Sequence, residues 1–254
     1  MSTVLITGAS GGIGYELAKL FARDHHNLIL IARSGDKLAQ IATELRAQNV
    51  TVKTIALDLA TPLAAKFLFD QLQTEGIAID ILINNAGFGA FGEFAQMSTD
   101  VIFGQIQLNI TSLTELTRLF LPAMLARRTG RIMNVASTAG FQPGPLMAVY
   151  YATKAYVISF SEALANEVRN SGVTATCFCP GATATGFAAR AHATDTFLFK
   201  LPMADATSVA SAGYRGMLRG SDLVIPGLYN KLVALGPRLA PRRLLLWISR
   251  KAIE

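Results

Sequence analysis

The chain has 254 residues, of which 51% are hydrophobic and 16% charged, and its formal net charge is +6. This length and composition suit one large α/β domain with a large buried core. No uncharged apolar run reaches 18 residues, so we expect no membrane-spanning helix. The N-terminus lacks a basic region followed by an apolar segment, so we expect no signal peptide and a cytoplasmic location.

The positive charge is concentrated at one end of the chain. Residues 215–254 contain eight basic and two acidic residues, whereas residues 1–214 contain fifteen of each. This distribution argues against a nucleic-acid-binding surface across the whole protein and calls for a local explanation.

Neither the cysteines nor the histidines indicate a metal site. Cys177 and Cys179 lie two apart in a strand-like run, which places both on one side, and we interpret them as small buried hydrophobic residues. The histidines at 25, 26 and 192 show no metal-ligand spacing, so no metal is predicted.

Apolar strand-like runs alternate with helical segments through the first 225 residues. The expected strands are 4–7, 27–32, 50–57, 80–83, 131–136, 173–178 and 223–225. The expected helices are 12–24, about 33–48, 61–75, 99–128, 150–170 and 205–219. Unbroken apolar strands separated by helices are typical of a parallel sheet covered on both faces. We predict such an α/β fold with a seven-stranded sheet.

The chain shows no internal repeat or linker, so we expect a single domain over residues 1–254. Its core spans residues 1–225. A less regular segment at about 182–205 is expected to close over the substrate, and residues 226–254 form a basic C-terminal tail.

A glycine-rich turn joins the first strand to the first helix. It reads Thr7-Gly-Ala-Ser-Gly-Gly-Ile-Gly14. Glycines at this place let a pyrophosphate approach backbone N–H groups at the positive end of a helix. The strand before the turn and the helix after it support a dinucleotide site, although the spacing differs from G-x-G-x-x-G.

The end of the second strand favours NADP over NAD. An acidic residue there would bind the ribose 2′-hydroxyl, whereas an arginine accommodates a 2′-phosphate. This chain has Arg33 and Ser34, and its next acid is Asp36. Asp58, after the third strand, either holds the adenine amino group or caps the following helix.

The residues from Ser137 to Lys154 form the candidate catalytic stretch. Ser137 follows an apolar strand, and Tyr150 and Lys154 stand four apart at an expected helix start. Residues at i and i+4 share one helix face, so the phenol and the ammonium can address one reacting group. A nearby cation lowers the pKa of a tyrosine and brings it closer to the pH at which general acid–base catalysis works.

These pieces together resemble the short-chain dehydrogenase/reductase family, in its branch of soluble members of about this length. The resemblance covers residues 3 to about 225. It rests on TGASGGIG at 7–14, Asp58-Leu59, NNAG at 84–87, Asn109, Ser137, Tyr150-x-x-x-Lys154 and PGATAT at 180–185. It implies a Rossmann-like, doubly wound fold, an NADP(H) cofactor and hydride transfer at an alcohol or carbonyl carbon. Homodimers or homotetramers built through the long helices are common in this family.

The resemblance also assigns roles by position. Tyr150 is the expected general acid/base, Lys154 binds the nicotinamide ribose and lowers the tyrosine pKa, Ser137 holds the substrate oxygen, and Asn109 kinks its helix and holds a relay water. The expected cofactor-binding residues comprise Gly8, Ser10, Gly11, Gly12, Ile13, Gly14, Arg33, Ser34, Asp58, Leu59, Asn85, Ala86, Gly87, Tyr150, Lys154, Pro180, Gly181, Thr183 and Thr185.

The expected substrate pocket is apolar. Phe187, Phe197, Leu198, Phe199 and Met203 follow the sixth strand, and the loop before Tyr150 adds Phe141, Leu146 and Met147. The strongest substrate-contact candidates are Ser137, Phe141, Met147 and Phe187. They predict a ketone, an aldehyde, a steroid-like compound or a long acyl compound, although aromatic residues in this segment would equally serve as core.

The tail allows two interpretations. Leu244–Ile248 is an apolar block between Arg242-Arg243 and Arg250-Lys251, as in a basic amphipathic helix that makes weak contact with an acidic membrane surface. Alternatively the helix docks on a subunit or on the substrate pocket. Five consecutive apolar residues exceed a clean surface stripe, which favours docking on protein.

The main functional hypothesis is an NADP-dependent carbonyl reductase acting on an apolar substrate, with a 3-oxoacyl-carrier or 3-oxoacyl-CoA reductase as the nearest rival. Two hypotheses of another class are a catalytically silent NADP-binding protein and a peripheral-membrane interaction protein. The presence of Asn109, Ser137, Tyr150 and Lys154 together favours an enzyme.

Overall fold

The computed structural model describes residues 1–194, 196–200 and 203–253. A seven-stranded sheet in the order β3-β2-β1-β4-β5-β6-β9 runs through the molecule, and all neighbouring strands in it are parallel. The strands are β1 (Thr3–Thr7), β2 (Asn27–Ala32), β3 (Val52–Ala56), β4 (Ile81–Asn84), β5 (Gly130–Val135), β6 (Val173–Phe178) and β9 (Leu223–Val224). The predicted fold is confirmed.

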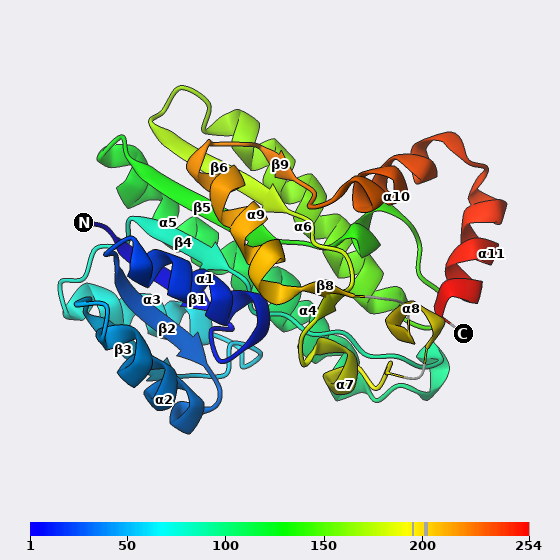
Figure 1. Cartoon of the computed structure of the whole chain (residues 1–254), viewed down its shortest axis with the longest axis horizontal. Coiled ribbons are helices and arrows are strands. Elements are labelled where there is room, and N and C mark those ends of the chain that lie inside the picture. The colour runs from blue at the N-terminus through cyan, green and yellow to red at the C-terminus, as the bar shows by residue number, and fades with distance from the viewer. Residues whose placement is uncertain (195, 201–202, 254) are drawn as a thin grey trace.

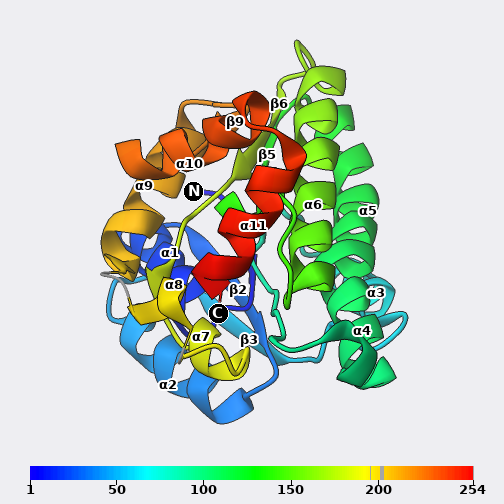
Figure 2. The same ribbon diagram turned by 90° about the vertical axis from the view of Figure 1, so that its right-hand side faces the viewer.

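Helices cover both faces of this sheet (Figures 1 and 2). One layer contains α1 (Gly12–Arg23), α2 (Gly35–Arg46) and α9 (Ala206–Leu218), and the other contains α3 (Ala64–Thr74), α5 (Leu113–Ala126) and α6 (Ala148–Glu167). The side chains of β1 show why two layers form. Val4 and Ile6 are buried in the first core and Leu5 in the second, because successive strand residues point to opposite faces.

The strand order reverses between β1 and β4, where the chain leaves one side of the sheet and returns on the other. In open α/β sheets a crevice forms at the carboxyl ends of the strands at such a point, and ligands bind there. The glycine-rich turn after β1 and the Asn-Asn-Ala-Gly loop after β4 meet at this edge.

Two expected helices differ from the prediction. The helix expected at 61–75 begins only at Ala64. Leu63 has a left-handed backbone (φ 65°), which prevents a continuous helix from starting at Thr61. The helix expected at 99–128 consists of α4 (Thr99–Ile106), a π-helical segment (Gln107–Ser112) and α5.

The chain after β6 contains elements that the sequence pattern did not predict. A small parallel pair joins β7 (Thr183–Ala184) to β8 (Ala204–Asp205), with α7 (Phe187–Arg190) and α8 (Phe197–Lys200) between them. The tail folds into α10 (Leu228–Leu239) and α11 (Arg242–Ile253), at the end of the molecule far from the N-terminus in Figure 1.

Two short turns complete the described elements, a 3-10 turn at Phe94–Gln96 and another at Thr138–Phe141. Among the described residues, no helix combines the length and apolar character needed to cross a bilayer. Nor does the described part of the chain gather three or more His, Cys, Asp or Glu side chains that could hold a metal ion.

Candidate active site

The structure brings together the four residues predicted to be catalytic. Ser137 follows β5, Asn109 lies in the π-helical segment, and Tyr150 and Lys154 project from the first turns of α6. The Tyr150 hydroxyl is hydrogen-bonded to Ser137, and Lys154 Nζ lies 5.8 Å from the centroid of the Tyr150 ring. The Ser137 Oγ also accepts a hydrogen bond from the Ala139 N–H at 3.1 Å, which fixes the hydroxyl at the end of β5.

Lys154 is buried behind the tyrosine. Its Nζ donates to the Val135 carbonyl oxygen at 2.8 Å, and only 5% of the residue is exposed. Burial lowers the pKa of Lys154 from 10.5 to about 8, and the nearby thiols Cys179 and Cys177 act in the opposite direction. These two cysteines are buried as predicted and unoxidised, with their Sγ atoms 3.5 Å apart.

The pKa of Tyr150 differs from the expectation that Lys154 would lower it. Burial raises the pKa of Tyr150 well above its ordinary value, and the hydrogen bond with Ser137 only partly opposes this effect. The physical reason is desolvation, which penalises the phenolate and the ammonium alike. In the protein alone, the buried pair therefore favours a neutral phenol.

Asn109 connects three parts of the site. Its side-chain Nδ2 donates to the Phe88 carbonyl oxygen at 2.8 Å and to Thr153 Oγ1 at 3.0 Å, and its Oδ1 accepts from the Phe88 N–H at 3.1 Å. The helix is distorted to π geometry at this residue, as often happens at functional sites. Thr153 was not among the predicted site residues, although its place directly before Lys154 could have drawn attention to it.

The glycine-rich turn is shaped as a dinucleotide site requires. Gly8 and Gly12 have positive φ angles of 68° and 55°. A Cβ atom on Gly8 would lie 2.9 Å from the Ala86 Cα, and one on Gly14 would lie 2.4 Å from the Gly8 carbonyl oxygen. A Cβ on Gly11 would meet nothing within 4 Å. This leaves open space at the N-terminus of α1, where an anion is favoured. Ser10 and Ile13 belong to the same turn.

The loop after β4 is fastened to this turn by Thr7 and Asn85. The Asn85 Nδ2 donates to the carbonyl oxygens of Thr7 and Gly8, at 2.9 and 3.2 Å. The backbone N–H groups of Asn85 and Ala86 both donate to Thr7 Oγ1 at 3.0 Å. The Asn85 amide thus shapes the turn instead of facing outward. A Cβ on Gly87 would lie 3.4 Å from Lys154 Nζ, so this loop also borders the catalytic lysine.

Arg33 and Asp58 lie together at the ends of β2 and β3. The two side chains are exposed, with Arg33 Nη1 4.0 Å from Asp58 Oδ2. Exposed pairs of this kind contribute little stability, so Arg33 is able to turn toward a phosphate. Ser34 caps α2 by position without a side-chain bond, and the Asp58 Oδ1 accepts from the Ala60 N–H at 2.9 Å. The Leu59 side chain is buried in the core, so a contact of Leu59 with the cofactor, which stays a prediction, would have to come from its backbone.

The segment after β6 lies against both the loop that follows Ser137 and the glycine-rich turn. The Thr138 N–H donates to the Pro180 carbonyl oxygen at 2.9 Å, and Thr183 Oγ1 donates to the Gly181 carbonyl oxygen at 2.9 Å. A Cβ on Gly12 would lie 2.9 Å from Thr185 Cγ2, so Thr185 lies against the glycine-rich turn.

An apolar cluster surrounds the Tyr150 ring. It contains Met147 and Tyr151, and Phe187, whose ring centroid lies 5.1 Å from that of Tyr150. Ile253, near the end of α11, is buried in the same cluster. Sequence reasoning missed this residue, because nothing in the tail pattern shows which side chain returns to the active site.

Several expected pocket residues lie elsewhere. Phe141 is partly buried against a separate cluster that contains Ala136 and Cys179, so its contact with the substrate stays a prediction, and Phe197 and Met203 are exposed. Pro202, which belongs to the predicted lid, lies outside the described residues.

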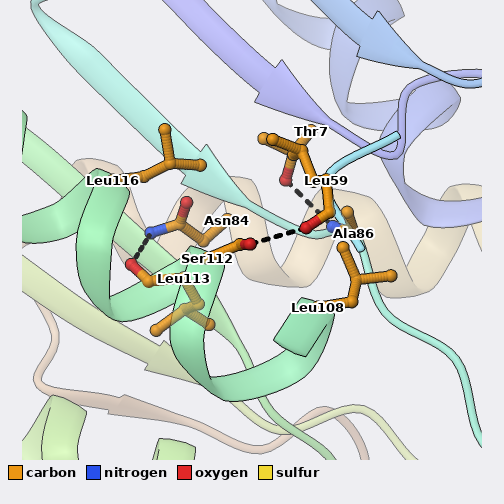
Figure 3. Close-up of a pocket in the computed structure, with 8 residues that line it drawn as sticks. All are labelled: Thr7, Leu59, Asn84, Ala86, Leu108, Ser112, Leu113 and Leu116. Atoms are coloured by element: carbon orange, nitrogen blue, oxygen red, sulfur yellow. Dashed lines mark hydrogen bonds between the residues drawn. The ribbon is translucent and has the colours of Figure 1, made fainter. Parts of the chain in front are cut away.

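A small cavity behind the site lies between β4 and the π-helical segment (Figure 3). Its volume of about 10 Å³ is room for one water molecule at most, so it is not the substrate pocket. Around it, Ser112 Oγ donates to the Leu59 carbonyl oxygen at 2.6 Å and Asn84 Nδ2 to the Leu113 carbonyl oxygen at 3.5 Å. Asn84 Oδ1 has no protein partner, as a bound water would explain.

Comparison with known families supports the same interpretation. The family model for short chain dehydrogenases matches residues 2–196. The chain belongs to this family of oxidoreductases. The family expectation is thereby confirmed.

Curated relatives are reductases that are longer than this chain. Ketoacyl reductase HetN of Nostoc sp. is 37% identical over 179 residues, which cover 70% of this chain and 62% of the relative. The human very-long-chain 3-oxoacyl-CoA reductase is 36% identical over 178 residues, covering 66% of this chain and 55% of the relative. The match thus spans little more than half of these relatives.

Solved structures resemble the chain over nearly its whole length. A short-chain dehydrogenase from Sphingobium yanoikuyae in complex with NADPH shows a TM-score of 0.84 at 36% identity, covering 91% of this chain and 90% of that one. The bulky-bulky ketone specific alcohol dehydrogenase of Comamonas testosteroni shows a TM-score of 0.80 at 32% identity, covering 96% and 99%.

Proposed function

We propose that this protein is an NADP(H)-dependent oxidoreductase that reduces an apolar ketone or aldehyde, or oxidises the matching secondary alcohol. The observation that carries the proposal is the hydrogen-bonded Ser137–Tyr150 pair, held at the carboxyl end of the parallel sheet inside an apolar cluster. The membership of the chain in a family of oxidoreductases supports the same reaction class.

The choice of NADP(H) rests on the glycine-rich turn and on Arg33. The turn leaves the N-terminus of α1 open for a pyrophosphate, and Arg33 is exposed at the end of β2, where a 2′-phosphate would lie. The similar protein from Sphingobium yanoikuyae was solved with NADPH, which agrees with this choice.

The residues of the site suit the reductive direction. The bound nicotinamide supplies the hydride. Tyr150 is a neutral phenol near neutral pH, a form that its burial also favours, and it can donate its proton to a carbonyl oxygen that accepts negative charge. Ser137 orients that oxygen through its hydroxyl, and the Lys154 ammonium behind the ring stabilises the phenolate that proton donation leaves.

The substrate is expected to carry a large apolar group next to its carbonyl. Met147, Phe187 and Ile253 present apolar surface around Tyr150. The similarity to an alcohol dehydrogenase described as specific for bulky-bulky ketones supports this choice.

A 3-oxoacyl thioester is the second candidate substrate. Two curated relatives are named ketoacyl and 3-oxoacyl-CoA reductases. In addition, α11 brings Ile253 to the tyrosine cluster while it carries basic residues such as Arg243 and Arg250 on the same helix. Carriers of acyl groups are anionic, so basic residues at the mouth of the site would favour them.

The deciding experiment measures NADPH consumption against ketones, aldehydes and 3-oxoacyl thioesters of graded chain length, with Tyr150→Phe as the blank. Turnover of ketones or aldehydes supports the main proposal, and turnover of thioesters alone selects the second candidate. If the protein binds NADPH but turns over no member of the panel, the proposal fails and a catalytically silent NADP-binding protein remains.

A further inference from the structure

The two tail helices expose an amount of apolar surface that is unusual for a folded protein. Leu228, Tyr229, Leu232 and Leu235 of α10 are exposed, and Leu228 retains 74% of its accessible surface. The spacing of residues 228, 232 and 235 places them on one stripe of the helix. An amphipathic helix normally turns such a stripe toward the core, whereas here it faces outward.

The outer face of α11 repeats this pattern. Leu245, Ser249 and Ile253 are buried against the body of the protein. On the opposite side Leu244, Trp247 and Ile248 are exposed, and Trp247 retains 62% of its accessible surface. Docking of the tail on the substrate pocket, one of the two interpretations of the sequence, thus accounts for only one face of α11.

We define the tail surface as the exposed apolar residues of both helices together with the basic residues beside them, namely Leu228, Tyr229, Leu232, Leu235, Leu244, Leu246, Trp247 and Ile248 with Lys231, Arg242 and Arg243. Both helices lie at one end of the molecule, and Figure 2 shows α11 facing the viewer there. Exposed apolar residues gathered on two helices at one end of the molecule are typical of an interaction site.

Charge decides which partner fits this surface. Residues 215–254 contain eight basic and two acidic residues. A two-fold contact between copies of the chain would place the same basic surface on both sides and bring like charges together. Exposed leucines and a tryptophan flanked by arginine and lysine instead match the interface of a membrane with anionic lipids, where apolar side chains enter and basic ones meet the headgroups.

We propose that the tail surface docks the protein on anionic phospholipid bilayers, with Trp247 and the α10 leucines inserted at the headgroup level. The same docking would place the site near the bilayer, because Ile253 on the inner face of α11 lies in the Tyr150 cluster. An apolar substrate dissolved in the membrane would then be within reach of the pocket.

The test uses the full-length protein and vesicles of phosphatidylcholine with or without phosphatidylglycerol. Trp247 is the single tryptophan of the chain, so its fluorescence reports on this surface alone. We expect a blue shift and co-sedimentation with the anionic vesicles, weakening as salt is raised, and quenching by lipids with brominated acyl chains. Binding to phosphatidylcholine alone should be much weaker.

Two pairs of variants make the test specific. Trp247→Glu should abolish sedimentation, whereas Phe67→Glu, which replaces a similarly exposed aromatic residue on α3 (59% against 62%), should not. Arg243→Glu should weaken binding roughly tenfold or more, and Arg118→Glu on α5 should have little effect. Circular dichroism and NADPH binding check that each variant is folded.

Some outcomes would overturn the proposal. They are the absence of sedimentation with anionic vesicles, equal losses for Trp247→Glu and Phe67→Glu, or a Trp247-dependent dimer that forms without any binding to lipid. The proposal would also be contradicted if Arg243→Glu lost turnover of a carrier-bound thioester while the wild type showed no binding to vesicles. Vesicle binding requires no substrate, so its failure is distinguishable from failure of the proposed reaction.

Discussion

Tyr150 and Lys154 show how burial and function oppose each other at single residues. Both side chains are buried, and both lose the stabilisation that water gives to their charged forms, so the pKa of the tyrosine rises and that of the lysine falls to about 8. The Val135 carbonyl oxygen and Ser137 supply the hydrogen bonds that make this burial tolerable. Burial of the pair therefore costs stability and keeps Tyr150 in its neutral form.

Tyr150→Phe should remove the proton donor and leave the packing intact. We expect kcat to fall by roughly 10²–10⁴-fold, the usual contribution of a positioned acid, with unchanged NADPH affinity. Steady-state kinetics and fluorescence titration measure the two effects. The control is Tyr151→Phe, because Tyr151 is also buried but has no lysine four residues later. Equal losses in the two variants would contradict the assignment of Tyr150.

Lys154 predicts a specific dependence of stability on pH. Its pKa is about 8 in the folded protein and 10.5 in the unfolded chain, so between these values the unfolded chain binds more protons. The free energy of unfolding therefore rises with pH through this window, and the cost of burial is fully present below pH 8. Across this pH window the free energy of unfolding of the wild type should rise by on the order of 3 kcal/mol more than that of Lys154→Met.

Urea denaturation of both proteins at several pH values across this window measures the gain. The tyrosines are common to both proteins, so their own titration cancels in the difference. A difference that does not change with pH would show that the folded-state pKa of Lys154 is not depressed.

Arg33→Ala should distinguish the two nicotinamide cofactors. A guanidinium bound to a 2′-phosphate contributes a charge-assisted hydrogen bond, so we expect NADPH affinity to fall roughly ten- to a hundredfold and NADH affinity to change little. Fluorescence titration with each cofactor measures this. Similar losses for both cofactors would refute the role of Arg33.

At the scale of elements, the glycine-rich turn is held by neighbours from distant parts of the chain. Asn85 and Thr7 tie it to the loop after β4, and Thr185 lies over Gly12 from the segment after β6. The turn therefore cannot relax independently of these segments. Its glycines are needed for different reasons, because a Cβ on Gly12 would meet Thr185 and one on Gly11 would meet nothing within 4 Å.

Gly12→Ala and Gly11→Ala should separate these reasons. Gly12 has φ 55° and Thr185 in the way of a Cβ, so alanine there should cost about 1–2 kcal/mol of stability. Gly11 has an extended backbone and free space, so alanine there should leave stability unchanged and weaken only NADPH binding. Thermal unfolding and cofactor titration provide the two readouts. Loss of stability in Gly11→Ala would contradict this division.

At the scale of the whole molecule, the tail closes back on the active site. The last described helix returns Ile253 to the Tyr150 cluster, and Asn230 of α10 packs on Gly181 at the end of β6. Residues from the middle of the chain and from its C-terminal part thus pack together around Tyr150, so we expect the shape of the substrate pocket to depend on how the tail is folded.

Ile253→Ala should therefore affect substrate binding more than chemistry. We expect KM for an apolar carbonyl substrate to rise up to roughly tenfold, with NADPH affinity unchanged, because apolar contact area is lost from one wall. Kinetics in a lipid-free assay measure this. Leu246→Ala on the exposed side of the same helix is the matched control and should leave KM unchanged. An unchanged KM in Ile253→Ala would place the tail outside the pocket.

The sequence by itself determined the parallel sheet, the glycine-rich turn and the tyrosine–lysine pair. Unbroken apolar strands can be buried only between two helical layers, and residues four apart on a helix must share a face. These are local regularities that the chain expresses without reference to distant contacts. Ser137 follows a predicted strand and the Tyr150–Lys154 pair begins a predicted helix, whereas Asn109 lies inside a predicted helix and was assigned only through the family resemblance.

Only the tertiary structure decided which side chains surround the reacting centre and what their environment does to them. The Leu59 side chain packs into the core, Phe141 is partly buried against a separate cluster, Ile253 packs into the Tyr150 cluster, and desolvation reversed the expected pKa shift of Tyr150. Burial and contacts between residues far apart in the chain depend on packing, which no local pattern contains. The same packing left the apolar faces of α10 and α11 outside, where the sequence alone had favoured docking on protein.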